Sequence, residues 1–431
     1  MLSPLRVGVI GAGYAGIAAA VALVRGGATV TLLDANRTPG GRARRVEYRG
    51  TTLDNGQHIL LGAYRDTLDL VRSVGAGERL LRREPLALHY PGLLRFSAPR
   101  LPAPLNLALA LAFAGGLAFA DRRAALRLSW SLRRAESAAR EGETVAELLE
   151  RLAQTPTLRR LLWDPLCVAA LNTPAERADA RVFARVLHDA LLRSRGDSDL
   201  LLPAADLSAL LPDPAIAWLG ERGTEIVLGQ RVTGIVREGS QWRLSGARRF
   251  DAIVCAAAPH EAGLLLSTVA GLESLSGRVL AIPHEPITTV YLQYESRVRL
   301  PYPMTGIDGG HAQWLFDREA IGGARGLVAA VVSASQSASR FDHDVLATSV
   351  HREIERLGAT LDPPAWTKVI TEKRATFACS PGAFRPPAET GAPGLVLAGD
   401  YTEGPYPATL EAAVRSGTRA ANIILERRTS T

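Results

Sequence analysis

The sequence predicts an α/β protein with two domains, each assembled from stretches that lie far apart in the chain. The length of 431 residues exceeds what one small core can use and fits two domains. The chain begins with a strand, a glycine-rich turn and a helix, and it closes with a second strand and helix of the same kind. Ends that both carry such units indicate one domain in which the two termini come together.

The opening unit has the pattern of a nucleotide-binding turn. Residues 7–34 read VGVIGAGYAGIAAAVALVRGGATVTLLD, and Val7–Ile10 suits a strand that is buried on both faces. Gly11, Gly13 and Gly16 then form G-x-G-x-x-G. In this motif the first glycine permits the tight turn, the second lets the backbone approach a pyrophosphate, and the third lets the helix pack on the strand. The helix would direct its N-terminal amides at the phosphates.

The acidic residue that such a site requires is also present. A second strand, 28–33, ends at Asp34, whose carboxylate can accept hydrogen bonds from both ribose hydroxyls and would repel a 2′-phosphate. A generic glycine-rich turn is the alternative in a chain with 40 glycines. The strand before the motif, the helix after it and the acid beyond favour a dinucleotide site.

Two further stretches indicate which dinucleotide is bound. Gly40-Gly41-Arg42 lets the chain pass close to a phosphate and place a guanidinium on it. Near the other end, a strand at 395–398 ends in Gly399-Asp400, and a helix starts at about Thr409-Leu410. Signals at both ends imply a long ligand. NAD needs no second motif, whereas FAD, with its ribityl chain and isoalloxazine, does, so FAD is the predicted cofactor.

Together, the G-x-G-x-x-G motif, the glycine pair with arginine and the terminal Gly-Asp resemble the flavin amine oxidase and phytoene desaturase superfamily. The resemblance implies a Rossmann-like FAD-binding domain and a discontinuous α+β substrate domain. It implies that Val232 touches adenine and that 251–259, DAIVCAAAP, returns to the nucleotide sheet. It also implies that the segment with Gly56 and Gln57 passes beside the isoalloxazine.

Longer strings resemble one group in this superfamily, the squalene-associated FAD-dependent desaturases of bacterial hopanoid gene clusters, or hydroxysqualene dehydroxylases. The strings are DNGQHILLGAY at 54–64, WDPLCVAALNTP at 163–174, EKRATFACSPG at 372–382 and GDYTEGPYPATLEAAVRSG at 399–417. The resemblance implies reductive removal of the hydroxyl of hydroxysqualene, which gives squalene and water. Alternatives are an oxidative carotenoid-type desaturase, an amine oxidase with Tyr401 and Tyr406 as an aromatic cage, and a non-enzymatic accessory subunit of squalene-forming enzymes.

Reductive dehydroxylation needs an acid that helps the hydroxyl leave as water, and three residues are candidates. His58 titrates near working pH, although it could instead hydrogen-bond a carbonyl or the flavin edge. Lys373 is one of only two lysines and could hold a water as a compact donor. Glu411 could serve as an acid or could complement the dipole of the last helix.

Hydrophobic stretches agree with a hydrophobic isoprenoid substrate. Residues 101–120 carry no charge, and arginines follow up to 134. A buried helix of the substrate domain is the preferred interpretation, and a peripheral membrane contact through 101–134 is the alternative. Val290, Leu292 and Tyr294 alternate with polar residues, as in a half-buried strand. Met304, Trp314 and Phe316 could line an apolar cavity.

The overall composition excludes several other classes. The net charge is +7, but no basic stripe is interleaved with aromatics, so no nucleic-acid partner is expected. The three cysteines are widely spaced, which supports neither a disulfide framework nor a metal site. The expected location is the cytoplasm, and peripheral contact with the inner face of the cytoplasmic membrane is the alternative kept open. The predicted FAD domain comprises 1–78, 205–262 and 391–431, and the substrate domain comprises the helical 79–204 and the strand-rich 263–390.

Overall fold

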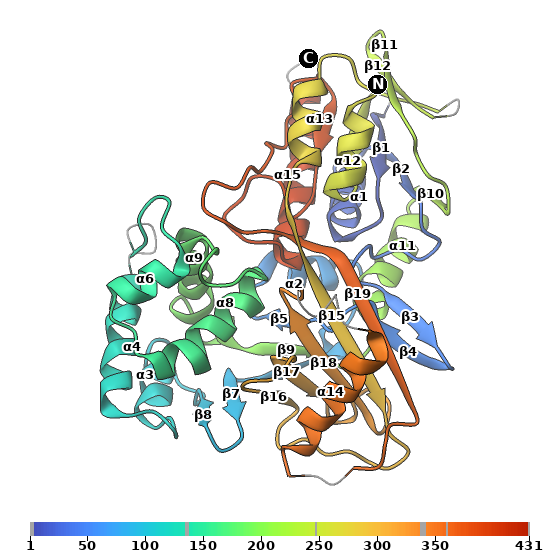
Figure 1. Ribbon diagram of the computed structural model, residues 1–431. Helices are drawn as coiled ribbons and strands as arrows, with labels where there is room; N and C mark the ends of the chain where they lie inside the picture. The colour runs from blue at the N-terminus through green and yellow to red at the C-terminus, as the bar shows by residue number, and fades with distance from the viewer. Residues whose placement is uncertain (1–3, 134–137, 246–247, 337–341, 359–360, 430–431) are drawn as a thin grey trace.

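The computed structural model describes residues 4–133, 138–245, 248–336, 342–358 and 361–429. Figure 1 shows the first and last segments side by side at the top of the molecule, with a group of helices at the lower left and a second sheet at the lower right. The two termini therefore belong to one layer.

A parallel five-stranded sheet forms the core of the terminal layer, in the order β10-β2-β1-β14-β20. Its strands come from all three segments predicted to form the FAD domain: β1 (Arg6–Ile10), β2 (Thr29–Asp34), β10 (Glu225–Leu228), β14 (Ala252–Cys255) and β20 (Leu395–Leu397). Except in the edge strand β10, which is partly exposed, these apolar runs are buried.

Helices α1 (Tyr14–Arg25) and α15 (Leu410–Thr429) pack on this sheet and against each other. A Cβ added to Gly417 would lie 2.0 Å from the carbonyl oxygen of Ala15, so the two helix backbones touch where α15 crosses α1. Also in this layer are α2 (Arg65–Ser73), α10 (Leu207–Leu210), α11 (Pro212–Gly220), β11 (Ile235–Glu238), β12 (Gln241–Leu244) and β13 (Arg249–Phe250).

The second large sheet is antiparallel, in the order β16-β17-β18-β15-β19. Its strands are β15 (His284–Gln293), β16 (Met304–Gly306), β17 (Trp314–Asp317), β18 (Leu327–Ser333) and β19 (Trp366–Phe377), and α14 (His343–Glu355) packs on one face. The expectation of a half-buried strand at 290–294 is wrong. Val290 and Leu292 face the α14 side, Tyr291 faces the main core, and all three are buried because both faces of the sheet are covered.

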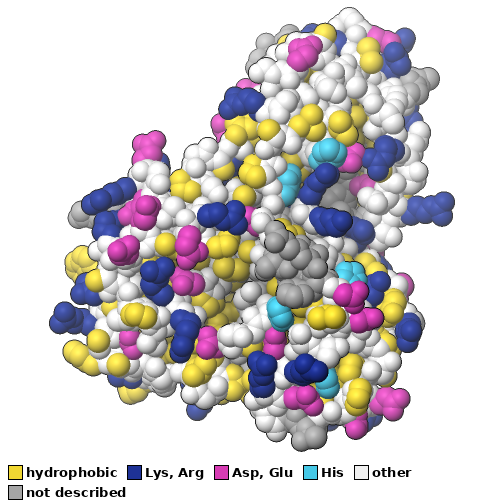
Figure 2. All heavy atoms as spheres, viewed as in Figure 1, with side chains coloured by type: hydrophobic (Ala, Val, Ile, Leu, Met, Phe, Trp, Pro, Cys, Tyr) yellow, Lys and Arg dark blue, Asp and Glu magenta, His cyan; other side chains and the backbone are white. Residues whose placement is uncertain are grey.

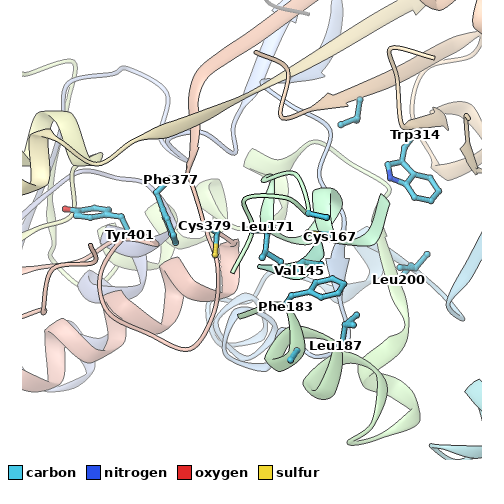
Figure 3. Packing of buried hydrophobic residues seen from close by; sticks show 14 of the residues in the cluster. Val145, Cys167, Leu171, Phe183, Leu187, Leu200, Trp314, Phe377, Cys379 and Tyr401 are labelled. Carbon is cyan, nitrogen blue, oxygen red and sulfur yellow. The ribbon is translucent and has the colours of Figure 1, made fainter. Parts of the chain in front are cut away.

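The region 79–204 is helical in its middle but begins and ends in strands. The helices are α3 (Leu105–Ala112), α4 (Phe119–Leu132), α6 (Val145–Arg151), α7 (Pro156–Leu158), α8 (Asp164–Leu171) and α9 (Ala180–Leu191). The strands are β6 (Leu81–Glu84), β7 (Ala87–Tyr90), β8 (Leu94–Ser97) and β9 (Leu200–Pro203), and β9 pairs with both β6 and β5 (Leu60–Leu61). Figure 3 shows the apolar core running from Tyr401 and Phe377 through Leu171 and Cys167 toward Trp314.

Three predicted domain boundaries do not coincide with structural breaks. The boundary at 262 falls inside α12 (Pro259–Leu266), which packs against α13 (Glu273–Leu280) beside the parallel sheet. The small β5-β9-β6 sheet joins residues on both sides of the boundaries at 78 and 204. Remaining elements are the hairpin β3 (Arg45–Tyr48) and β4 (Thr51–Asp54) and the short helical turns at 78–80, 159–163, 195–198 and 319–321.

Candidate active site

A cavity of about 580 Å³ runs from the glycine-rich turn of the parallel sheet to the inner face of the antiparallel sheet. This volume lies in the range of cofactor and ligand sites. Twelve of the thirteen residues predicted to bind the cofactor line it: Gly11, Gly13, Asp34, Gly41, Arg42, Gly56, Gln57, Val232, Gly399, Asp400, Thr409 and Leu410. The exception is Gly16, whose role is structural.

Gly16 is required by the contact between helix and strand. A Cβ at this position would lie 1.7 Å from the carbonyl oxygen of Gly11, so no side chain fits there. A Cβ on Gly13 would meet nothing closer than the Cα of Gly41, at 3.8 Å. The glycine-rich turn and the Gly40-Gly41 pair are thus two facing backbones, and a side chain on Gly13 would project into the cradle between them.

Asp34 closes this cradle from the end of β2. Its Oδ2 accepts a hydrogen bond from the amide of Ala12 at 2.6 Å, and its Oδ1 accepts from the amide of Asn36 at 2.7 Å. Oδ1 also accepts from Nδ2 of Asn36 at 3.1 Å, so the carboxylate organises the turn itself, and Oδ2 retains a second lone pair for a ligand in the cavity.

Arg42 and Asp400 join the two ends of the chain at the site. The Nη2 of Arg42 donates to Oδ1 of Asp400 at 2.7 Å, and Nη1 donates to the carbonyl of Ala375. The guanidinium predicted to meet a phosphate is thus already paired with the carboxylate that follows β20. Arg44, which the sequence analysis did not select, also lines the cavity and donates to the carbonyl of Gly41.

Gln57 and His58 both lie on the cavity wall, but they differ in which of their side-chain atoms are already hydrogen-bonded. Gln57 Oε1 accepts from Arg318 Nη1 at 2.9 Å, and Gln57 Nε2 donates to the carbonyl of His58, so the Gln57 side chain is committed to protein partners. His58 Nδ1 lies 2.7 Å from the carbonyl of Gly56. Because a carbonyl only accepts, Nδ1 carries the proton, and Nε2 of the neutral ring is an acceptor.

The environment of His58 disfavours the charged imidazolium. Burial and, to a smaller extent, the charge of Arg42 lower the pKa of His58 below 6.5, while the hydrogen bond to Gly56 opposes them. The ring is therefore neutral at pH 7. It gains a proton on Nε2 as the pH falls, and the imidazolium that forms is a stronger acid than an exposed one.

The other two candidate acids do not reach the cavity, and both expectations are corrected here. Lys373 is exposed, whereas its neighbours on β19, Glu372 and Arg374, line the cavity, because side chains alternate along a strand. Glu411 is fully buried and bonds to the N-terminal amides of α2 at Thr67 and Asp66, where it offsets the helix dipole.

Polar atoms without partners mark where a ligand fits. Among the described residues, three buried side-chain atoms that line the cavity have no hydrogen-bond partner: Tyr14 Oη, His284 Nε2 and Tyr401 Oη. Burial raises the pKa of Tyr401, so its hydroxyl stays protonated and can donate. A Cβ on Gly399 would lie 2.4 Å from the Tyr401 ring, which explains a glycine there. A polar cofactor with acceptors for the two tyrosine hydroxyls fits this set of side chains.

The far end of the cavity is apolar and aromatic. Trp314 and Phe316, two residues apart on β17, share the inner face of the antiparallel sheet with Ile287 and Val331. Ala169 and Ala170 of α8 also line the cavity, and the sequence analysis did not single them out. Met304, expected to join this wall, is buried but is not part of the lining.

Comparison with known proteins agrees with this geometry. Residues 14–425 match the family model of flavin containing amine oxidoreductases. The chain is 30% identical to a hydroxysqualene dehydroxylase of Rhodopseudomonas palustris, over 97% of this chain and 98% of that protein. It is 28% identical to one of Zymomonas mobilis, over 97% and 98%.

A solved structure shares the fold. Cyclohexylamine oxidase from Brevibacterium oxydans superposes with a TM-score of 0.72 at 18% identity, covering 99% of this chain and 100% of the other. The Rossmann-like fold of the amine oxidase type and FAD as the cofactor, both predicted from the sequence, are confirmed. The chain belongs to the family of flavin containing amine oxidoreductases and is an FAD-dependent oxidoreductase.

Proposed function

We propose that this enzyme removes the hydroxyl of hydroxysqualene reductively, giving squalene and water. The observation that carries the proposal is the continuity of the cavity, from the nucleotide cradle at Gly13 to the aromatic wall at Trp314 and Phe316. Similarity to hydroxysqualene dehydroxylases over nearly the whole chain supports the same substrate class.

The apolar wall would hold the isoprenoid chain and exclude water from the reacting carbon. Trp314 and Phe316 present aromatic rings from one face of the sheet, and such rings attract positive charge. An allylic carbon that loses its hydroxyl develops positive charge, so the same wall would stabilise it. FAD in its reduced form, when bound, supplies the hydride that replaces the hydroxyl.

His58 would supply the proton. In the imidazolium form, Nδ1–H still donates to the carbonyl of Gly56, which fixes the ring, and Nε2–H can donate to the substrate hydroxyl. The carbon–oxygen bond then breaks, the oxygen leaves as water, and the carbon gains the hydride. Because its pKa lies below 6.5, the imidazolium is a stronger acid than an exposed one, but only a small fraction of His58 carries the proton at neutral pH.

The positions of Tyr401 and Tyr406 favour this reaction over amine oxidation. An aromatic cage from Tyr401 and Tyr406 is not assembled, since Tyr406 donates to Asp189 Oδ2 at 2.7 Å and only Tyr401 lines the cavity.

The test is anaerobic turnover of the FAD-loaded enzyme. Hydroxysqualene in detergent would be supplied to the photoreduced enzyme, and phytoene and an amine would be supplied to separate samples of the oxidised enzyme. The flavin oxidation state and the products would be followed in each case. Squalene formation coupled to flavin oxidation supports the proposal. Oxidation of phytoene or of the amine by the oxidised enzyme, without squalene formation in the reduced one, overturns it.

The pH profile tests the role of His58. If the imidazolium is the acid, kcat/KM falls as pH rises through the pKa of His58, which lies below 6.5. His58→Gln should abolish this dependence and slow turnover by ~10²–10⁴-fold, the usual contribution of a general acid. His343→Gln, an exposed position on α14, serves as the matched control. A parent rate that is flat down to pH 5, or falls on acidification, contradicts the assignment.

A further inference from the structure

Helices α3 and α4 present a row of large apolar side chains to solvent. We call this set the α3–α4 surface, and its members are exposed to these extents: Leu105 59%, Leu109 37%, Phe113 82%, Phe119 79%, Leu126 52% and Trp130 72%. The preferred expectation for 101–120, a buried helix, is therefore wrong for this face. Only the opposite side of α3, with Asn106, Ala110 and Leu111, is buried.

Helical geometry puts these side chains on common stripes. In α4, Phe119, Leu126 and Trp130 lie within about 40° of one another around the axis at ~100° per residue. In α3, Leu105 and Leu109 are one turn apart. The helices pack against each other, so the two stripes lie on neighbouring helices.

The segment that carries the α3–α4 surface is rich in arginine. Residues 85–133 contain six arginines and a single acidic residue, Asp121. Asp121 is buried, and its carboxylate accepts from the amide of Ala118 and the hydroxyl of Thr155. Arg133 stacks on Trp130, with its guanidinium carbon 4.8 Å from the ring. In Figure 2 hydrophobic and basic side chains appear together at the lower left, with some acidic ones among them, where Figure 1 places these helices.

We propose that the α3–α4 surface docks on a lipid bilayer that contains anionic headgroups. Protruding Phe and Trp side chains suit insertion at the boundary between headgroups and acyl chains, and flanking arginines suit lipid phosphates. No helix in the described part of the chain combines the length and hydrophobicity needed to cross a bilayer, so the contact is interfacial. This docking proposal does not depend on the proposed reaction. Docking on a bilayer would nevertheless bring the enzyme to an isoprenoid substrate dissolved in lipid.

The experiment measures sedimentation of the FAD-loaded full chain with vesicles. Vesicles of phosphatidylcholine alone and with about one third phosphatidylglycerol are compared at low and high salt. The parent should partition onto the anionic vesicles, and salt should weaken but not abolish binding, because apolar burial is not screened. Phe113→Ser, Phe119→Ser and Trp130→Ser should each lower the partition coefficient by roughly tenfold.

Arginine variants test the electrostatic part. Arg123→Gln and Arg133→Gln should each reduce binding to anionic vesicles by roughly fivefold and leave binding to phosphatidylcholine unchanged. Leu264→Ser on α12 and Val345→Ser on α14 are matched controls, because these side chains are 47% and 53% exposed elsewhere. Retained FAD absorbance and an unchanged thermal midpoint confirm that every variant is folded.

Three outcomes overturn the proposal. The parent could fail to sediment with anionic vesicles, or the serine and control variants could bind equally. The parent could also self-associate and become monomeric only in the serine variants, without binding vesicles, which would assign the surface to a second copy of the chain. Loss of binding in the serine and arginine variants alone supports the bilayer, whatever substrate the enzyme uses.

Discussion

Replacing Asp54 by asparagine should stabilise the protein at neutral pH. Asp54 is 2% exposed, its Oδ1 accepts from the amide of Leu207 at 2.8 Å, and its carbonyl accepts from the hydroxyl of Tyr291. Burial raises the pKa of Asp54 from 3.8 to about 6, and the bond from Leu207 opposes the increase. The residue holds the start of the segment that carries Gly56 and His58.

The magnitude follows from linkage. Because the folded-state pKa lies above the unfolded one, the stability that the protonated carboxyl contributes is complete below about pH 3.8 and is lost as pH rises through about 6. The difference is roughly two pH units at ~1.4 kcal/mol each, or about 3 kcal/mol at pH 7 and above. Asparagine keeps the acceptor for Leu207 and places an amide donor where the protonated acid has its hydroxyl.

The assay is urea unfolding of parent and Asp54→Asn proteins between pH 5 and 8. The variant's advantage in unfolding free energy should widen by ~1.4 kcal/mol per pH unit up to about pH 6 and then level off at about 3 kcal/mol. Asp69→Asn, an exposed acid on α2, should change stability by less than about 0.5 kcal/mol at every pH. A pH-independent difference, or a variant less stable than the parent at pH 8, would refute the reasoning.

Further predictions concern the cofactor. Gly13→Val should yield a folded protein without FAD, because the side chain enters the cradle, whereas Gly16→Val should not fold; absorbance at 450 nm and circular dichroism separate the two. Asp400→Asn should cost about 1.5–3 kcal/mol by removing the charged partner of Arg42, and FAD should dissociate faster, as dilution fluorescence would reveal. Trichloroacetic acid should release FAD into the supernatant, because the cysteines are buried and none lines the cavity; a yellow pellet would contradict this.

Local pattern was sufficient for the nucleotide end of the site. The places of the glycine-rich turn, Asp34 and the terminal Gly399-Asp400 at the cavity were predictable because each depends on backbone geometry within a few residues. The strands that precede these motifs were also predicted to within about a residue. Short apolar runs of this kind commonly form the buried strands of a parallel sheet.

Side-chain direction was not predictable in the same way. Lys373 appeared suited to catalysis, but a shift of one residue along β19 reverses the face, so Glu372 and Arg374 line the cavity. Glu411 also appeared suited to be an acid. In the structure, however, it accepts from the amide of Asp66 at the start of α2, 345 residues earlier in the sequence. The position of Lys373 along β19 fixed the direction of its side chain, and the packing of α15 beside α2 fixed the partners of Glu411.

The sequence by itself determined that the chain binds FAD across a parallel sheet, because those signals are short-range and each glycine or acid has a steric or hydrogen-bonding reason for its position. Only the tertiary structure decided that Arg42 pairs with Asp400, that His58 is a neutral, half-buried ring, and that 105–130 shows its apolar side to solvent. These properties depend on which surfaces meet over long separations, and burial, pKa and exposure are set by those contacts rather than by neighbouring residues.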